Sequence, residues 1–231
     1  MGLENRLKYF LQKHTEIQKV GERYTVKRSK VSVILPSSFT KEVCRIIGII
    51  HGDGNMSGRR FHVTDQNLEY HRYLQELFEK TFGIKLNIFH DKNRNTFYSY
   101  SKNSIVYKYL TEVLEIPAGA VRSKLRIPKF LKELPLELQA EYIGGLFDSE
   151  SHIRERQAEI DFSTTSKEVW DFVKEFLTKI GIKFSERIRK RRKNPEFEIF
   201  IYGKNNLKIF NNFVKLHHPD KIKKIMLFLP H

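Results

Sequence analysis

Two apolar stretches of the chain carry small residues four positions apart, and each ends in a carboxylate. The first spans residues 46–54 and contains Asp53, and the second spans residues 143–151 and contains Glu150. Since residues four apart share one face of a helix, both stretches predict helices whose small residues let two backbones pack closely. If the helices pack there, their last turns meet and Asp53 becomes a neighbour of Glu150.

The sequence after each apolar helix predicts further strands and helices in the same order. In the first half these are a strand at 61–64, a helix at 68–82 that ends at Gly83, strands at 85–89 and 96–101, and a helix at 104–114. The second half has a strand at 158–162, a helix at 169–180 that ends before Gly181, strands at 182–188 and 197–202, and a helix at 207–216. Glycine at these ends suits the left-handed residue that terminates many helices. Each half is interpreted as an approximate αββαββα unit.

Three landmarks recur in the same order, which predicts a duplicated chain. Asp53 and Glu150 are 97 apart (150 − 53), residues 83–85 and 181–183 are 98 apart (181 − 83), and residues 100–103 and 202–205 are 102 apart (202 − 100). We therefore expect an α+β fold of two pseudo-symmetric halves, residues 41–130 and 131–231, with the boundary near 128–135.

Residues 1–40 lie outside the repeat and form a basic extension that leads into the first half. They are interpreted either as an added DNA-contacting arm or as a cap that packs on the outer helices. Thr40 is expected to cap the first apolar helix, because a threonine oxygen can accept a free N–H of the first turn.

The charge of the chain favours a polyanionic partner. Lys and Arg number 42 against 27 Asp and Glu, which gives a net charge of +15, and nucleic acid is the commonest partner of such a protein. A ribosomal or membrane-surface protein could carry the same charge. The single cysteine, Cys44, excludes an intrachain disulfide and a cysteine zinc cluster, and we expect it to be a small buried side chain. No signal-peptide core and no membrane-spanning run is found, so an intracellular protein is expected.

Two neighbouring carboxylates predict a cation between them. Carboxylates held close together repel each other unless a cation binds, and hard divalent ions prefer oxygen ligands. Asp53 and Glu150 are therefore the candidate ligands of a metal site at the centre of the duplicated fold.

These residues resemble a known family. The two acidic helices resemble the paired signature of LAGLIDADG homing endonucleases, in the single-chain form that carries both copies, and the likeness extends over roughly residues 34–228. The segment His218-Pro219-Asp220-Lys221 resembles a common ending. Two departures are His51, in place of the earlier acidic residue of the first signature, and Ser151, in place of glycine at the end of the second.

The resemblance implies a fold and a cofactor. The two signature helices would form the interface, and each half would present a curved antiparallel sheet, so that both sheets form a saddle over the major groove of duplex DNA. Asp53 and Glu150 would hold Mg²⁺ with the backbone carbonyls of Gly52 and Ser149. Mn²⁺ is expected to substitute, and Ca²⁺ to support binding without cleavage. The metals would activate water and stabilise the leaving 3′ oxygen on each strand.

The resemblance also suggests roles around the carboxylates. Lys102 and Lys204 match a basic position near the attacking water and would stabilise charge on the phosphate. Asp65 and Thr164 match positions that order water. At the first acidic position of the two signatures, His51 and Asp148 are interpreted as packing or capping residues.

DNA contacts are expected from exposed strand and turn residues. In the first half these are Arg59, Arg60, His62, Lys85, Asn87, Arg94 and Tyr98; in the second they are Arg154, Arg156, Arg187, Arg189, Arg191 and Arg192. Arginine can bond guanine bidentately, whereas the basic run at 189–193 is expected to grip phosphates. Since the halves differ at these positions, the target should be asymmetric.

The predicted function is a monomeric, Mg²⁺-dependent DNA endonuclease encoded by a mobile intron. Two alternatives share the fold: a maturase that binds its host intron RNA, and a DNA-binding regulator whose nuclease has decayed. An intein origin is not expected, because the chain starts with Met1 and ends in His231 without the residues used in splicing.

Overall fold

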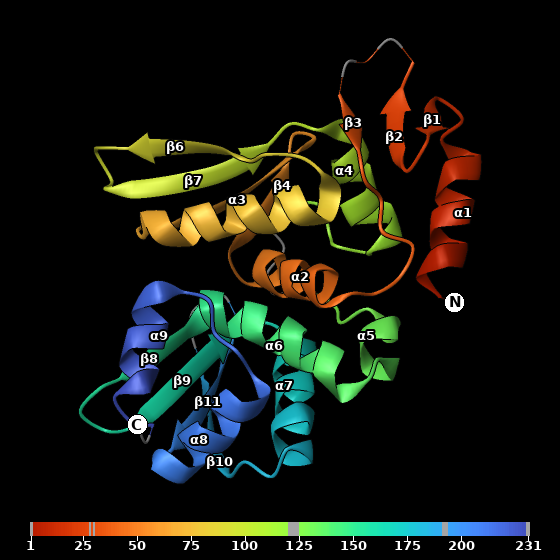
Figure 1. Cartoon of the computed structure of the whole chain (residues 1–231). Coiled ribbons are helices and arrows are strands. Elements are labelled where there is room, and N and C mark those ends of the chain that lie inside the picture. Colours follow the sequence, from red (N-terminus) through yellow and green to blue (C-terminus); the bar gives the residue numbers. More distant parts are fainter. Residues whose placement is uncertain (1, 28, 30, 120–124, 191–193, 230–231) are drawn as a thin grey trace.

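The computed structural model describes residues 2–27, 29, 31–119, 125–190 and 194–229. Helices α2 (Lys41–Asp53) and α6 (Leu136–Glu150) lie side by side between two α+β halves (Figure 1). None of the helices in these ranges is long and apolar enough to span a membrane. The two predicted apolar helices are thus the centre of the fold.

The two halves repeat the same order of elements. The first half continues through β4 (Gly54–Ser57), β5 (Arg60–Asp65), α3 (Leu68–Phe82), β6 (Asn87–Asp91), β7 (Thr96–Ser101), α4 (Ser104–Lys108) and the π-helix η1 (Tyr109–Val113). The second half begins with α5 (Lys129–Glu133) and, after α6, continues through β8 (Ser151–Arg154), β9 (Glu159–Thr164), α7 (Lys167–Lys179), β10 (Phe184–Arg189), β11 (Glu196–Tyr202), α8 (Lys204–Phe213) and α9 (Pro219–Met226). The antiparallel sheets have the matching orders β4-β5-β7-β6 and β8-β9-β11-β10. The predicted α+β fold of two pseudo-symmetric halves is confirmed.

The strand predicted after each acidic helix is the second strand of a hairpin. Its first strand, β4 or β8, follows directly from the helix, and residues such as Gly54 and Asn55 give β4 little intrinsic strand preference. Strands β6 and β10 begin two residues later than predicted, because Leu86 and Ile182 are buried as anchors in front of them.

Local capping residues end and begin the helices as the sequence predicts. The Thr40 hydroxyl accepts the N–H of Val43 at 3.3 Å at the start of α2. Gly83 follows α3 with φ of +64°, and Gly181 follows α7 with φ of +75°, conformations that cost glycine little.

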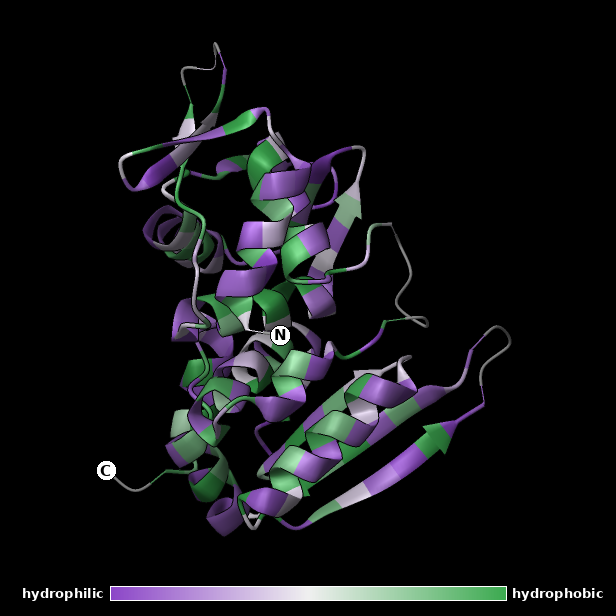
Figure 2. Cartoon of the chain, turned by 90° about the vertical axis from the view of Figure 1, so that its right-hand side faces the viewer, coloured by the Kyte–Doolittle hydropathy of each residue, from purple (hydrophilic) through white to green (hydrophobic). Residues whose placement is uncertain are grey.

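Each sheet has one face covered by helices and one face that we call the open face. Residues directly opposite on neighbouring antiparallel strands share a face. Phe61, Val63 and Ser99 in the first sheet, and Phe162 and Ile199 in the second, are buried on the covered face. The helices turn their hydrophobic residues toward the sheets and toward each other, and hydrophilic residues outward (Figure 2).

The N-terminal segment folds onto the first half. It forms α1 (Leu3–Lys13) and a three-stranded sheet of β1 (Ile17–Val20), β2 (Arg23–Val26) and β3 (Ser32–Val33). Lys13 Nζ lies 2.7 Å from Oε2 of Glu112 in η1, and Arg23 Nη2 donates to the carbonyl of Gly83 at 3.0 Å. Of the two interpretations, the packed cap describes this segment; contact with DNA stays a prediction.

Cys44 lies inside α2 with no exposed surface, and burial raises the pKa of its thiol to about 12. Since the thiolate is the reactive form, we expect Cys44 to resist a disulfide reagent at pH 8 in the folded protein. The measurement is reagent uptake with and without denaturant. Stoichiometric labelling of the native protein at the rate seen in denaturant would contradict the buried position.

Candidate active site at the helix interface

Glycines let α2 and α6 approach backbone to backbone. A Cβ on Gly48 would lie 2.1 Å from the carbonyl oxygen of Tyr142, and a Cβ on Gly145 would lie 2.4 Å from the carbonyl oxygen of Arg45. Real side chains do not tolerate these distances, so only glycine permits this crossing. The predicted packing through small residues is confirmed.

The last turns of the two helices also touch. A Cβ on Gly52 would lie 2.4 Å from the Cβ of Ser149 and 3.3 Å from the Cγ of Glu150. Asp53 and Glu150 are the last residues of α2 and α6. The interface therefore brings both carboxylate-bearing ends to one place.

Each carboxylate opens onto a cleft. The cleft at Asp53 has a volume of about 500 Å³ and is lined partly by His62 and Thr64 of the first open face. The cleft at Glu150 is smaller, about 110 Å³, and is lined partly by Ser163 of the second open face. The two clefts share His51, Leu125 and Thr165 as lining residues. Both carboxylates thus lie on the side where the open faces of the two sheets are exposed.

Two polar pairs cross the interface at equivalent positions. Arg45 Nη1 lies 3.1 Å from Asp148 Oδ2, and His51 Nδ1 lies 3.0 Å from the hydroxyl of Tyr142. Each residue of one pair is 97 positions from a residue of the other (142 − 45 and 148 − 51). The pseudo-symmetry therefore preserves the contact but changes its chemistry, from an ion pair to a neutral hydrogen bond.

The neutral pair depends on burial. His51 is buried, and this lowers the pKa of its imidazole to about 3. An uncharged imidazole at neutral pH can pair with a phenol in a site where a second ion pair would lose its hydration. The predicted packing role of His51 is consistent with this contact.

Known proteins share this sequence pattern and this arrangement of helices and sheets. Residues 137–215 match a family model described as a LAGLIDADG-like domain. The homing endonuclease I-DmoI, in its complex with DNA and Mn, has a TM-score of 0.55 at 15% identity, over 77% of this chain and 98% of that one. The N-terminal LAGLIDADG domain of DUF199/WhiA has a TM-score of 0.53 at 13% identity, over 80% of this chain and 86% of that one. At these identities the likeness shows the fold.

This chain has the LAGLIDADG fold, and its second half matches the family model.

The curated relatives of this chain differ widely in name. The glutamine–fructose-6-phosphate aminotransferase of Methanocaldococcus jannaschii is 30% identical over 85% of this chain, and a probable translation initiation factor IF-2 of the same organism is 26% identical over 83%. The tRNA-splicing ligase RtcB of Methanopyrus kandleri is 23% identical over 88%. The chain spans 18%, 17% and 23% of their respective lengths.

The donor atoms at the centre of the LAGLIDADG fold fit a hard cation. Asp53 and Glu150 offer carboxylate oxygens, and the Oδ1 of Asn55, a lining residue of the Asp53 cleft, is buried without a hydrogen-bond partner. Among the described residues, no group of three or more His, Cys, Asp and Glu side chains could hold a metal. Mg²⁺ is suited to such a site, since it binds through one or two carboxylates and keeps waters and substrate phosphates as its other ligands.

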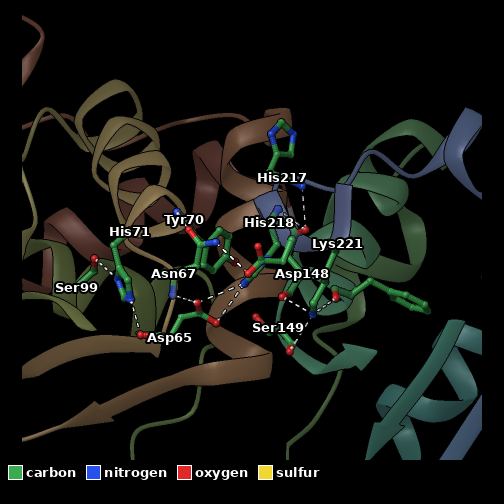
Figure 3. A network of polar contacts seen from close by, with 12 residues as sticks. Asp65, Asn67, Tyr70, His71, Ser99, Asp148, Ser149, His217, His218 and Lys221 are labelled. Carbon is green, nitrogen blue, oxygen red and sulfur yellow. Dashed lines mark hydrogen bonds and ion pairs between the residues drawn. The ribbon is translucent and has the colours of Figure 1, made fainter. Parts of the chain in front are cut away.

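Lys221 occupies the end of α6, and sequence reasoning did not find it. Its Nζ donates to the carbonyls of Phe147 at 2.8 Å, Asp148 at 2.6 Å and Ser149 at 3.3 Å (Figure 3). Burial lowers the pKa of Lys221, and the nearby carboxylates, Asp148 first, oppose this. The Ser149 carbonyl, predicted to bind metal, is therefore shared with an ammonium. The only signal was the His218–Lys221 segment, which had been assigned no role.

Asp148 joins α6 to the start of α9. Its Oδ1 accepts the backbone N–H of His217 at 2.8 Å and of His218 at 3.0 Å (Figure 3). Its Oδ2 lies 3.1 Å from Nη1 of Arg45. A carboxylate at a helix start satisfies N–H groups that have no partner within the helix. The interpretation of Asp148 as a capping residue is supported by these contacts.

Asp65 and Thr164, both assigned to ordering water, lie in different surroundings. Thr164 lines the Glu150 cleft. Asp65 lies 3.3 Å from Nε2 of His218 and accepts the N–H of Asn67 at 2.6 Å. Burial opposes the charge of Asp65, but these two hydrogen bonds hold its pKa below the usual value. Asp65 thus links the first half to α9.

The structure corrects the predicted position of Lys102. Across β5, Ser99 is level with Gly54, the neighbour of Asp53, and β7 runs from Ser99 away from Asp53. Lys102 lies three residues further along. It is absent from the described residues that line either cleft.

Lys204 also lies away from its predicted position, for the same reason. Across β9, Ile199 is level with Ser151, the neighbour of Glu150, and β11 leads away from it toward Lys204, the first residue of α8. Lys204 lines a different groove with residues 227–229. Matching repeat positions placed both lysines at equivalent strand ends, but those are the ends far from the carboxylates.

The predicted DNA contacts fall into three groups. Those whose side chains belong to the open faces are Arg60, His62, Asn87, Tyr98, Arg154, Arg187 and Arg189. Those in turns or before a strand are Arg59, Lys85, Arg94 and Arg156. Arg191 and Arg192 lie outside the described residues. A DNA-contacting role for all of them stays a prediction.

Arg45 should contribute strongly to stability. Its side chain is 2% exposed, and it pairs with Asp148, which has no exposed side-chain surface, and with Glu141. We expect Arg45→Met to lower the free energy of unfolding in urea by about 3 kcal/mol, since it leaves a buried carboxylate uncompensated. Arg126→Met is the matched control, because Arg126 pairs with Glu168 while 78% exposed and should cost far less. Equal losses would contradict the buried pair.

Proposed function

We propose that this protein is a divalent-metal-dependent endonuclease that binds duplex DNA as a monomer at a long, asymmetric site and hydrolyses both strands. One observation carries the proposal. The contact of Gly52 with Ser149 and Glu150 brings the carboxylate-bearing ends of α2 and α6 together, where their clefts adjoin two open sheet faces.

Different residues of the chain would have different roles in this activity. Asp53 and Glu150 would hold Mg²⁺, with the carbonyl of Gly52 as a further oxygen. When bound, the metal supplies an activated water and stabilises charge at the phosphate. Lys221 holds the last turn of α6 and so positions Glu150. The open faces would hold the duplex, since side chains that alternate along a strand can reach base edges in the major groove.

The curated relatives support a link to a mobile element. Segments similar to most of this chain lie within an aminotransferase, an initiation factor and an RNA ligase, which share no activity by name. A module that recurs in unrelated proteins behaves as an inserted unit. This recurrence favours homing as the biological role. It also weakens the prediction that the chain does not derive from an intein. The intracellular location stays a prediction.

The test is a selection from fragmented genomic and randomised duplex DNA. The protein is allowed to bind in Ca²⁺ against competitor, the bound pool is then moved to Mg²⁺, and Asp53→Asn is run alongside. We expect one asymmetric sequence of about two helical turns, cut on both strands by the unmutated protein alone. An enriched sequence that stays intact would favour the regulator. Failure to enrich any DNA would favour the maturase and intron RNA.

A further inference from the structure

The open faces of the two sheets differ in chemistry. In the first sheet, cross-strand pairing puts His62 opposite Tyr100, Asn87 opposite Tyr100, and Phe89 opposite Tyr98. The corresponding face of the second sheet pairs Arg187 with Glu198 and Arg154 with Glu159. Because these side chains point away from the helices, they are the ones that a bound duplex would meet.

The first open face is aromatic at its centre, and its charged residues Arg60 and Asp91 lie at strand ends. The ring of Tyr98 lies 6.0 Å from His62 and 6.3 Å from Phe89, and Phe89 is 57% exposed. Burial, and then the charge of Arg60, lower the pKa of His62, so its imidazole is neutral at physiological pH. This face therefore offers exposed rings and the amide of Asn87.

The second open face carries arginines held by carboxylates. Its rings are Phe200, whose centroid lies 5.1 Å from the guanidinium of Arg187, and Tyr202 at the end of β11. Arg189 Nε lies 2.9 Å from Glu198, and Arg187 bonds the same carboxylate through its own Nε. Arg154 Nε lies 2.9 Å from Asp161 and 3.3 Å from Glu159. The Glu198 side chain is 9% exposed, whereas the arginine side chains are 43–49% exposed.

All three arginines bind their carboxylates through Nε, and this sets which guanidinium N–H groups can reach DNA. That bond fixes the plane of the guanidinium and uses its Nε edge, so the outer edge, which has one N–H from each terminal nitrogen, faces away from the carboxylate. Two parallel N–H donors of this kind match the O6 and N7 of guanine. A carboxylate beside them can accept from the amino group of cytosine, but it would repel a phosphate.

We propose that the target DNA is asymmetric in composition: A·T-rich under the first sheet and G·C-rich under the second. Exposed rings contact the methyl group of thymine, and Asn87 can bond adenine bidentately, whereas the anchored arginines select guanine. The inference rests on the proposed DNA binding and names the sequence class of that same substrate. Glu198 acts on specificity as a positioning residue, through Arg187 and Arg189.

The experiment is the Ca²⁺ selection from randomised duplex DNA, run with three proteins. The unmutated chain should enrich a site with one A·T-rich and one G·C-rich half. Glu198→Gln keeps the side-chain size but weakens the anchor, so guanine preference in the G·C-rich half should fall about tenfold. Asn87→Ala, the matched variant in the first sheet, should relax adenine preference in the other half only. Urea unfolding of all three confirms that each remains folded.

The outcomes separate this inference from the proposed function. An enriched site with the same composition in both halves would overturn the inference and leave DNA binding intact. So would a Glu198→Gln protein that loses affinity equally for all sequences, as expected of a merely structural residue. If the unmutated chain enriches no DNA, the proposed function fails, and this inference fails with it.

Discussion

Asp53→Asn and Glu150→Gln should each lower the rate of double-strand cleavage at least about a thousandfold, a loss of roughly 4 kcal/mol of transition-state stabilisation. Each substitution keeps the size of the side chain but removes the negative charge that holds a cation. The residues end α2 and α6, where Gly52 meets Ser149, so the helix interface itself is unchanged. The measurement is single-turnover cleavage of the selected site in Mg²⁺, with binding measured separately in Ca²⁺.

A control separates the site from general charge effects. Asp171→Asn makes the same chemical change on α7, where Asp171 pairs with Lys167 on the surface. The Asp171→Asn protein should cleave DNA at the rate of the unmutated protein. Cleavage that survives in both site variants, or binding and folding lost together with cleavage, would contradict the assignment of Asp53 and Glu150.

Gly48→Val should prevent stable folding. A Cβ at this position would lie 2.1 Å from the carbonyl oxygen of Tyr142, and main-chain atoms cannot move aside as a flexible side chain can. To relieve the overlap, α2 and α6 would have to separate, which exposes the apolar residues of both. We expect a loss of about 5 kcal/mol or more, comparable to the stability of many domains. Urea unfolding followed by circular dichroism measures it.

Gly2→Val is the matched control for this prediction. Gly2 has an ordinary φ of −62°, and no atom lies within 4 Å of a Cβ built on it. Its stability should stay close to that of the unmutated protein. If Gly48→Val unfolded at the same urea concentration as Gly2→Val, the close crossing of α2 and α6 would be wrong.

Strand register and contacts between distant segments determine which lysines lie near the carboxylates, and the sequence did not predict this. Lys102 and Lys204 match between the repeats, yet antiparallel pairing places both at strand ends away from the carboxylates. Lys221 lies 72 residues from Ser149 in the chain, and only the packing of α9 against the end of α6 brings their atoms together. No local pattern encodes such a contact.

The sequence by itself determined the duplication, the helix ends and the packing of the two helices that end in Asp53 and Glu150. These depend on short-range features: small residues four apart define a helix face, and caps such as Thr40 and Gly83 act within one turn. Only the tertiary structure decided which side chains surround the carboxylates and how Glu198 anchors two arginines. Those contacts join residues on different strands and helices, so they depend on register and packing, which arise when the whole chain folds.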